Sequence, residues 1–209
     1  MEKPRIVSAE EWQRARAELL QAEKQSTRML DALAAQRRRL PMVKLPGAYA
    51  FETPAGTRTL VELFEGRSEL VVYQFMDRGP DAYCPGCTAF TNNVPVAGLA
   101  ALAARGITWV TVSNMPLVQI EAYKARMGWT LPFVSSGGTS FADDCGVGPG
   151  FMLTAFLRDG DDVYRTYAAT ARGVDRLMFT HSILDLTAYG RQEDWEESPP
   201  GWPQHPTYG

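Results

Sequence analysis

The sequence lacks a strong excess of either charge, and it lacks any long apolar run. Its 24 acidic and 21 basic side chains give a formal net charge of −3, so the chain has no overall positive field to attract nucleic acid or anionic lipid. No window approaches the roughly 18 apolar residues of a membrane span, and the start "MEKPRIVSAEEWQ" lacks the apolar stretch of a secretory signal. We therefore expect a cytoplasmic protein with no nucleic-acid partner and no membrane partner.

The chain is also poor in cysteine, with three, and in histidine, with two. Structural disulfides are rare in a reducing compartment, so two neighbouring cysteines there indicate redox chemistry or metal binding before they indicate a crosslink. The 209 residues are 45% hydrophobic and 22% charged, which is typical of an ordinary globular protein. This length allows one large domain with a substantial core.

A long helical segment is predicted before the main domain. Ser8 and Glu11 have the spacing of a capping box, and apolar residues recur at helical spacing from about 9 to 39, as one helix or as two with a break near Ser26. Its apolar positions indicate that it lies against the domain or against a second copy in a homodimer. The expected division is 1–44 as an N-terminal helical extension, 45–190 as the main domain, and 191–209 as an irregular tail rich in proline and tryptophan.

Strands and helices alternate in the main domain. The stretch "LVVYQFM" at 70–76 is a nearly continuous apolar run, as in a strand that is covered on both faces of a parallel sheet. Further strands are predicted at 107–112, 131–134, 151–157 and 163–167, helices at 95–105, 116–127 and 174–190, and a short hairpin around 54–56. The polar turn "RDGDD" makes an antiparallel hairpin of the last two strands. This order predicts an α/β sandwich with a mixed sheet.

The stretch "CPGC" places two thiols, Cys84 and Cys87, where a buried strand has ended and a helix begins. At a helix N-terminus, unpaired backbone N–H groups and the helix dipole favour a thiolate at Cys84. Pro85 suits the first helical position, and residues three apart on a first turn lie close enough for a disulfide. Reversible oxidation is therefore the leading hypothesis. Two others stay open: inert thiols, and a zinc site that could be assembled only from Cys84, Cys87, Cys145 and either His181 or His205.

Beyond these residues, the chain resembles a known family. The segments "LPMVKLPGAYAFETPAG", "LVVYQFM", "CPGC", "VTVSNMPLVQIEAYKARMGWTLPFVSS" and "GVDRLMFTHSILDLTAYGR" are similar to an uncharacterised bacterial thioredoxin-like family of predicted dithiol-disulfide oxidoreductases, near the peroxiredoxin branch. The similarity spans about residues 8–195, and "IEAYKARMGW" is its most specific part. The resemblance implies a thioredoxin-like three-layer fold, with Cys84 as the attacking thiol and Cys87 as the resolving one. The first hypothesis is therefore exchange with an unidentified protein or small-molecule thiol or disulfide, without metal or organic cofactor.

The sequence departs from related folds at two places. Thioredoxins carry a cis-proline before the strand that faces the dithiol, whereas the matching position here is Met152 or Leu153 and the nearest proline is Pro149. Peroxiredoxins carry a threonine three residues before the peroxidatic cysteine, where this chain has Asp81. A thiol peroxidase that uses Cys84 is accordingly the second hypothesis. The third is a non-catalytic thioredoxin-like binding module.

Other residues allow both a structural and a functional interpretation. Cys145 is predicted to be a small buried residue, with exchange against the dithiol as the alternative. His181 lies on the apolar stripe of the last predicted helix, which favours a hydrogen-bonded core residue. Arg126 and Trp129 lie where a helix ends and a strand begins, and a structural role is favoured over a substrate rim.

Overall fold

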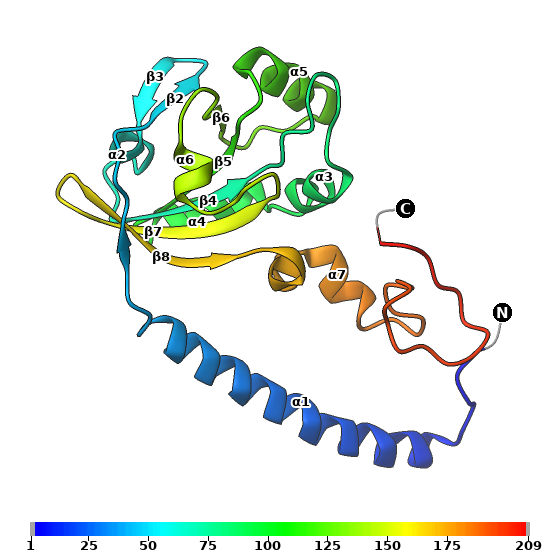
Figure 1. Cartoon of the computed structure of the whole chain (residues 1–209). Coiled ribbons are helices and arrows are strands. Elements are labelled where there is room, and N and C mark those ends of the chain that lie inside the picture. Colours follow the sequence, from blue (N-terminus) through cyan, green and yellow to red (C-terminus); the bar gives the residue numbers. More distant parts are fainter. Residues whose placement is uncertain (1–2, 208–209) are drawn as a thin grey trace. The chain divides into compact units, whose positions relative to one another are not determined.

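The computed structural model describes residues 3–207. These residues form two compact units, one of 42–183 and one that combines the segment ending at Pro41 with Leu184–Thr207. The larger unit contains the sheet and the dithiol, and the smaller one contains the long N-terminal helix (Figure 1). The predicted three-part division into 1–44, 45–190 and 191–209 stays a prediction.

The larger unit is built on a sheet whose described strands number eight and run in the order β1-β8-β7-β4-β5-β6-β2-β3. Three central neighbours, β4, β5 and β6, are parallel, and all other pairs are antiparallel. The strands are β1 (Val43–Lys44), β2 (Ala50–Thr53), β3 (Gly56–Thr59), β4 (Glu69–Gln74), β5 (Ile107–Ser113), β6 (Phe133–Ser135), β7 (Met152–Asp159) and β8 (Asp162–Ala169). The predicted mixed sheet and both predicted hairpins are confirmed.

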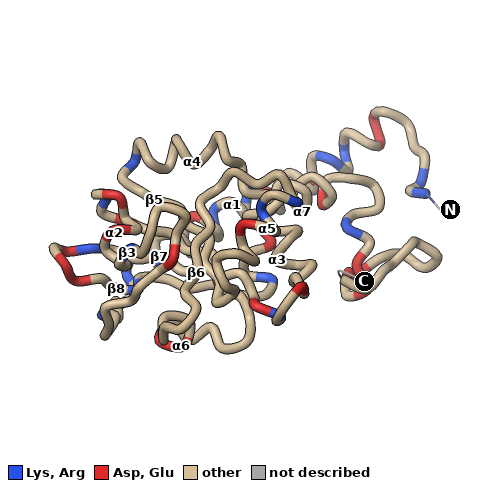
Figure 2. Tube along the Cα trace, turned by 90° about the horizontal axis from the view of Figure 1, so that it is seen from above, with Lys and Arg blue, Asp and Glu red and all other residues tan. Residues whose placement is uncertain are grey.

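Two hydrophobic clusters lie on opposite faces of this sheet. Side chains alternate along β4, so Leu70 and Val72 contribute to one cluster while Tyr73 contributes to the other. The first cluster includes residues of α2 (Leu60–Leu63) and α6 (Phe141–Asp144). The second includes residues of α3 (Pro85–Asn92), α4 (Val96–Ala103), α5 (Leu117–Met127) and the 3₁₀ helix η1 (Ala171–Leu177). Helices therefore cover both faces, and α4 and α6 can be seen on opposite sides of the strands in Figure 2.

Predicted helix ends in the larger unit are largely confirmed. α5 ends at Gly128, whose φ of +68° places it in the left-handed region that glycine adopts readily. Gly106 likewise has a positive φ after α4, just before β5. The helices α2 and α6 and the edge strand β1 were not predicted, because elements of two to four residues are too short to show a periodic pattern.

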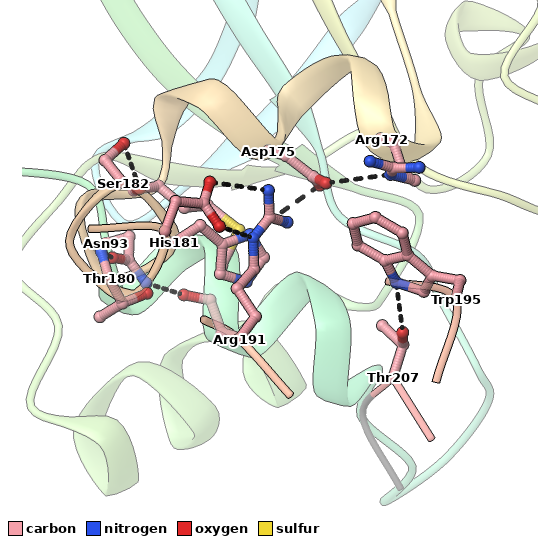
Figure 3. Close-up of polar contacts among 12 residues, drawn as sticks. Asn93, Arg172, Asp175, Thr180, His181, Ser182, Arg191, Trp195 and Thr207 are labelled. Atoms are coloured by element: carbon pink, nitrogen blue, oxygen red, sulfur yellow. Dashed lines mark hydrogen bonds and ion pairs between the residues drawn. The ribbon is translucent and has the colours of Figure 1, made fainter. Parts of the chain in front are cut away.

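The prediction of one helix over 174–190 is wrong. η1 ends at Leu177, Met178 has an extended backbone with φ −92° and ψ 113°, and α7 (Phe179–Leu184) follows. Of the residues predicted to form its apolar face, Val174, Met178 and His181 are buried, whereas Leu177 and Leu184 are exposed. α7 begins beside α3, because the backbone N–H of Thr180 donates to Oδ1 of Asn93 at 2.9 Å (Figure 3). A contact between distant segments thus interrupts the helix that local spacing predicts.

The smaller unit contains α1 (Ala9–Arg37), a continuous helix with no break near Ser26. Only half of the predicted capping box forms: the Ser8 hydroxyl accepts from the Glu11 backbone N–H, while the Glu11 carboxylate pairs with Arg5 at 2.6 Å. α1 has no buried residue. No helix within residues 3–207 is both long enough and apolar enough to cross a membrane.

Residues 185–207 contain no helix or strand, although a helix was predicted as far as residue 190, and this segment is held by specific contacts. The indole of Trp195 donates to Thr207 at 3.1 Å, and the rings of Tyr189 and Trp202 lie edge to face 5.0 Å apart. A single β-bridge joins Glu193 to His205. Aromatic side chains and a β-bridge therefore hold an irregular segment by local contacts.

Candidate functional site

The helix α3 begins after the loop that follows β4 (Figure 1), and its N-cap residue is Cys84. Its sulfur accepts a hydrogen bond from the backbone N–H of Cys87 at 3.3 Å. Pro85 occupies the first helical turn, where the missing N–H costs nothing. The position predicted for Cys84 at the start of this helix is confirmed.

The two thiols differ in accessibility. Cys84 is 7% exposed and Cys87 is 0% exposed, and both are free thiols. The sulfur of Cys87 accepts from the backbone N–H of Met76 at 3.5 Å, at the end of the segment that leads out of β4. A molecule that approaches from solvent therefore meets the sulfur of Cys84 before that of Cys87.

Hydrogen bonds to the sulfur lower the pKa of Cys84 to about 6. The largest contribution is the thiol of Cys87, and the backbone N–H groups of Cys87 and Gly86 and the charge of Arg78 act in the same direction, against the effect of burial. The pKa of Cys87 is raised, first because its proton is held by Cys84 and second because it is buried. One thiolate and one thiol thus coexist at neutral pH.

A chain of hydroxyl groups holds the first turn of α3 against α5. The Thr88 hydroxyl donates to the carbonyl oxygen of Cys84 at 2.8 Å. Thr88 Oγ1 also lies 2.6 Å from the Tyr123 hydroxyl oxygen. Because Thr88 has only one hydroxyl proton, Tyr123 must be the donor in this second bond. The position of Cys84 therefore depends on a residue of α5.

A stacked pair of aromatic rings lies beside the dithiol. The rings of Tyr83 and Tyr123 are 3.6 Å apart with an interplanar angle of 11°. The guanidinium carbon of Arg126 is 4.7 Å and 4.6 Å from their centroids. A group above an outer face of the stack would be much farther from one centroid than from the other, so Arg126 lies at the edge of both rings.

These residues border an open hollow of about 530 Å³ next to the start of α3. Its lining residues come from the loop before the dithiol, from α3 and from α5: Asp81, Tyr83, Pro85, Thr88, Ala89, Asn92, Tyr123 and Arg126. Sequence reasoning did not identify Thr88 or Tyr123 as parts of the site. The segment "IEAYKARMGW" was the available signal, since it contains Tyr123, Arg126 and Trp129.

Two further bonds join the α5 region to the surroundings of the dithiol. The indole N–H of Trp129 donates to Asn92 at the end of α3, at 2.8 Å. The amide of Gln119 donates to the carbonyl of Gly79, in the loop before Cys84, at 3.0 Å. The structural role predicted for Trp129 is thus observed, and the position of Arg126 at the hollow agrees with the substrate rim that was considered less favoured.

The third thiol, Cys145, lies on the other face of the sheet from the dithiol. It is 1% exposed in the cluster that contains Leu70 and Val72. Burial raises its pKa to about 12. Its predicted role as a small buried residue is confirmed, and the sheet separates it from the pair with which exchange was considered.

His181 is a buried residue of the C-terminal helices, as predicted. It is 8% exposed, and its Nδ1 lies 4.0 Å from a carboxylate oxygen of Asp175, which also pairs with Arg172 at 3.6 Å (Figure 3). Within residues 3–207, no three side chains of His, Cys, Asp and Glu come together as they would around a metal ion. Among the described residues, the cysteines and histidines considered for a zinc site are therefore not brought together.

Comparison with solved structures finds matches of low sequence identity. A thiol:disulfide interchange protein from Bacteroides sp. is 12% identical, with 75% of this chain and 95% of that one covered and a TM-score of 0.51. Reduced Prx3 from Vibrio vulnificus, solved with H₂O₂, is 19% identical over 62% and 85% of the two chains, with a TM-score of 0.42. Peroxidoxin BcpB from Mycobacterium tuberculosis is 17% identical over 66% and 90%, with a TM-score of 0.44. The first of these supports the thioredoxin-like fold.

A search among curated proteins finds no match to the chain. A family model does match, over residues 1–208, and its description is "Bacterial protein of unknown function (DUF899)". Because the match covers nearly all of the sequence, the protein belongs to this bacterial family, in agreement with the resemblance found in its sequence.

Proposed function

We propose that this protein catalyses thiol-disulfide exchange, with Cys84 as the nucleophile and Cys87 as the resolving thiol. The observation that carries the proposal is the pair itself: a thiol with a pKa of about 6 at a helix N-cap, three residues from a buried thiol that donates to it. At pH 7 a group with this pKa is about nine-tenths ionised. Cys84 is then a thiolate, which is the nucleophilic form.

In the first step, the Cys84 thiolate attacks one sulfur of a substrate disulfide. A bond forms between Cys84 and that sulfur, the substrate S–S bond breaks, and the second half leaves as a thiolate that takes a proton from solvent. The backbone N–H groups of Gly86 and Cys87 favour the thiolate of Cys84 before the attack. The product of this step is a mixed disulfide.

In the second step, Cys87 loses its proton and attacks the Cys84 sulfur. The Cys84–Cys87 disulfide forms, the mixed disulfide breaks, and the other substrate half leaves as a thiol. Two electrons pass from the protein to the substrate. A second thiol compound must then reduce the protein, and we infer on this ground a cytoplasmic location, where thiols keep such pairs reduced.

Burial supports this division of roles. Cys87 has no exposed surface, so it is suited to attack a sulfur that is already bonded to Cys84. The N–H of Met76, which donates to Cys87, favours the Cys87 thiolate when it forms. Once Cys84 is bonded to substrate, it no longer holds the Cys87 proton, and the main cause of the raised pKa of Cys87 is removed.

The test is the reduction of bis(2-hydroxyethyl) disulfide, a small neutral substrate, by the reduced protein. We expect Cys84→Ser to lower the rate at least about a hundredfold, to that of an unreactive thiol. Cys87→Ser should keep the first step and accumulate the mixed disulfide, which intact-protein mass spectrometry detects. Cys145→Ser is the matched control, because it removes a buried thiol on the other face of the sheet, and it should react like the unmodified protein.

Two outcomes would contradict the proposal. The first is a Cys84→Ser variant that reacts as fast as the unmodified protein, since Cys84 would then not be the nucleophile. The second is rapid consumption of hydrogen peroxide without disulfide reduction, which would assign the same thiol to a peroxidase. Absence of both activities would leave the non-catalytic binding module.

We also propose that α1 pairs with α1 of a second copy. A heptad pattern runs along α1, with one position at Trp12, Leu19, Ser26 and Leu33. The position three residues later is apolar each time, at Ala15, Ala22 and Met29, as in the seam of a coiled coil. Trp12, Leu19, Met29 and Leu33 are all exposed. Light scattering should give the mass of a dimer, and Leu19→Lys should lower it to that of a monomer. A monomeric unmodified protein would contradict this pairing.

A further inference from the structure

Resting on the proposed exchange function, we propose that the hollow beside Cys84 binds a carboxylate group of a small anionic disulfide, with Arg126 as the residue that recognises it. The structure brings three features together at this place: a thiol at a helix N-cap, a hollow of small-molecule size, and an arginine at the edge of a stacked aromatic pair.

The hollow lies next to Cys84. Tyr83 and Pro85, the chain neighbours of Cys84, both line it, and Thr88, which donates to the Cys84 carbonyl, lies on its wall. A volume of about 530 Å³ is within the range of sites for small molecules. The proposal therefore places one half of the disulfide in the hollow, with its sulfur toward Cys84, whose two chain neighbours form part of the wall.

Arg126 is available for an anion. Its guanidinium is at the edge of the Tyr83 and Tyr123 rings, and in the part of the chain that the structure describes it has no carboxylate partner. By contrast, Lys124 on the same helix pairs with Glu121 at 3.0 Å. A guanidinium presents a planar fork of N–H donors that matches a carboxylate, and the aromatic rings limit its movement. Arg126 is thus held beside the hollow with its charge unpaired.

The other charged residue of the hollow is Asp81, and its substitution provides a second test of the proposal. Asp81 is exposed in the loop before Cys84, and its charge opposes the binding of an anion. The whole chain is also negative, with a formal charge of −3, so the long-range field disfavours an anionic substrate. A preference for an anionic disulfide would therefore have to come from a local cation.

The experiment compares three disulfides of similar size and different charge, each reduced by the reduced full-length protein: 3,3′-dithiodipropionate (anionic), bis(2-hydroxyethyl) disulfide (neutral) and cystamine (cationic). Each rate is divided by the rate at which dithiothreitol reduces the same disulfide. This ratio removes differences in intrinsic reactivity among the three disulfides. We expect the normalised rate for the anionic disulfide to exceed that for the neutral one about fivefold. Higher salt should reduce this preference, because part of it is an exposed charge contact.

Arg126→Gln should abolish that fivefold preference, measured as the ratio of the normalised rate for the anionic disulfide to that for the neutral one. Arg126→Lys should retain part of the preference, since it keeps the charge but loses the planar fork. Asp81→Asn should increase the preference and slow the reaction with cystamine. Arg105→Gln is the matched control, an exposed arginine that does not line the hollow, and it should change none of the ratios.

An unmodified protein without any anionic preference would overturn the assignment of the hollow. An Arg126→Gln variant with an unchanged preference, or an equal loss in Arg105→Gln, would overturn the role of Arg126. These results are distinct from failure of the exchange function itself, which would appear as an unmodified protein that does not reduce even the neutral disulfide.

Discussion

Cys84 and Cys145 are both buried thiols next to a helix, yet their surroundings give them opposite properties. Cys84 precedes the first turn of α3, where N–H groups and a second thiol donate to its sulfur, and its pKa is about 6. Cys145 follows the last turn of α6, where burial dominates, and its pKa is about 12. The comparison shows that hydrogen-bond donors at a helix N-terminus can outweigh the desolvation of a buried thiolate.

The largest expected difference between these two thiols is in alkylation. In the native reduced protein at pH 7, iodoacetamide should modify Cys84 at least about a thousandfold faster than Cys145, because only the thiolate reacts and Cys84 alone is mostly ionised. Peptide mass spectrometry after timed quenching measures both rates. Unfolding in denaturant should make the rates equal. Similar rates in the native protein would show that the two environments do not differ as described.

A smaller difference is expected in the pH dependence of stability, with opposite signs for the two residues. The pKa of Cys84 is below the ordinary 9.0, so its thiolate stabilises the folded state fully above pH 9, and this contribution is lost as the pH falls through 6. The pKa of Cys145 is above 9.0, so the contribution of its thiol is present below pH 9 and is lost as the pH rises toward 12.

Urea unfolding under reducing conditions measures this difference. Between pH 6 and 8.5, the unmodified protein should gain about 2 kcal/mol of unfolding free energy relative to Cys84→Ser. Relative to Cys145→Ala, the difference should stay constant over the same range. A constant difference for both variants would mean that the Cys84 thiolate is not favoured by the fold.

The smallest expected effect concerns the bond between α3 and α5. Thr88→Val removes the hydroxyl that accepts from Tyr123 and donates to the Cys84 carbonyl, so it should cost about 1 kcal/mol of unfolding free energy and slow the alkylation of Cys84 about twofold. Thr166→Val is the control, because its hydroxyl donates to the carbonyl of Ala155 within the sheet. If both variants slowed the alkylation of Cys84 equally, the Thr88 hydrogen bonds would not be what positions Cys84.

The strands and the dithiol were predictable because their signals are local. A continuous apolar run predicts β4, the turn "RDGDD" predicts the β7–β8 hairpin, and a CxxC pair between a strand and a helix predicts a thiol at an N-cap. The hairpin of β2 and β3 also followed from its turn residues. In each case a few adjacent residues contain the whole physical cause.

The remaining features depend on contacts between distant segments. The break at Met178 accompanies the bond between Thr180 and Asn93, which are 87 residues apart in sequence. Likewise, the edge position of Arg126 results from the stacking of Tyr83 on Tyr123, which no spacing within α5 reveals. The segment "IEAYKARMGW" could be recognised as specific, but its place beside Cys84 required the fold.

The strand order described above also bears on how the folded chain behaves at high concentration. The sheet ends in β1, which has two residues, on one side and in β3, which has four, on the other. Unpaired backbone groups at a sheet edge are templates for strands of other molecules, and short edge strands are one of the ways in which natural proteins limit such pairing. The long central strands β4, β5 and β7 are all flanked on both sides. The two terminal strands therefore offer few unpaired backbone groups for such pairing.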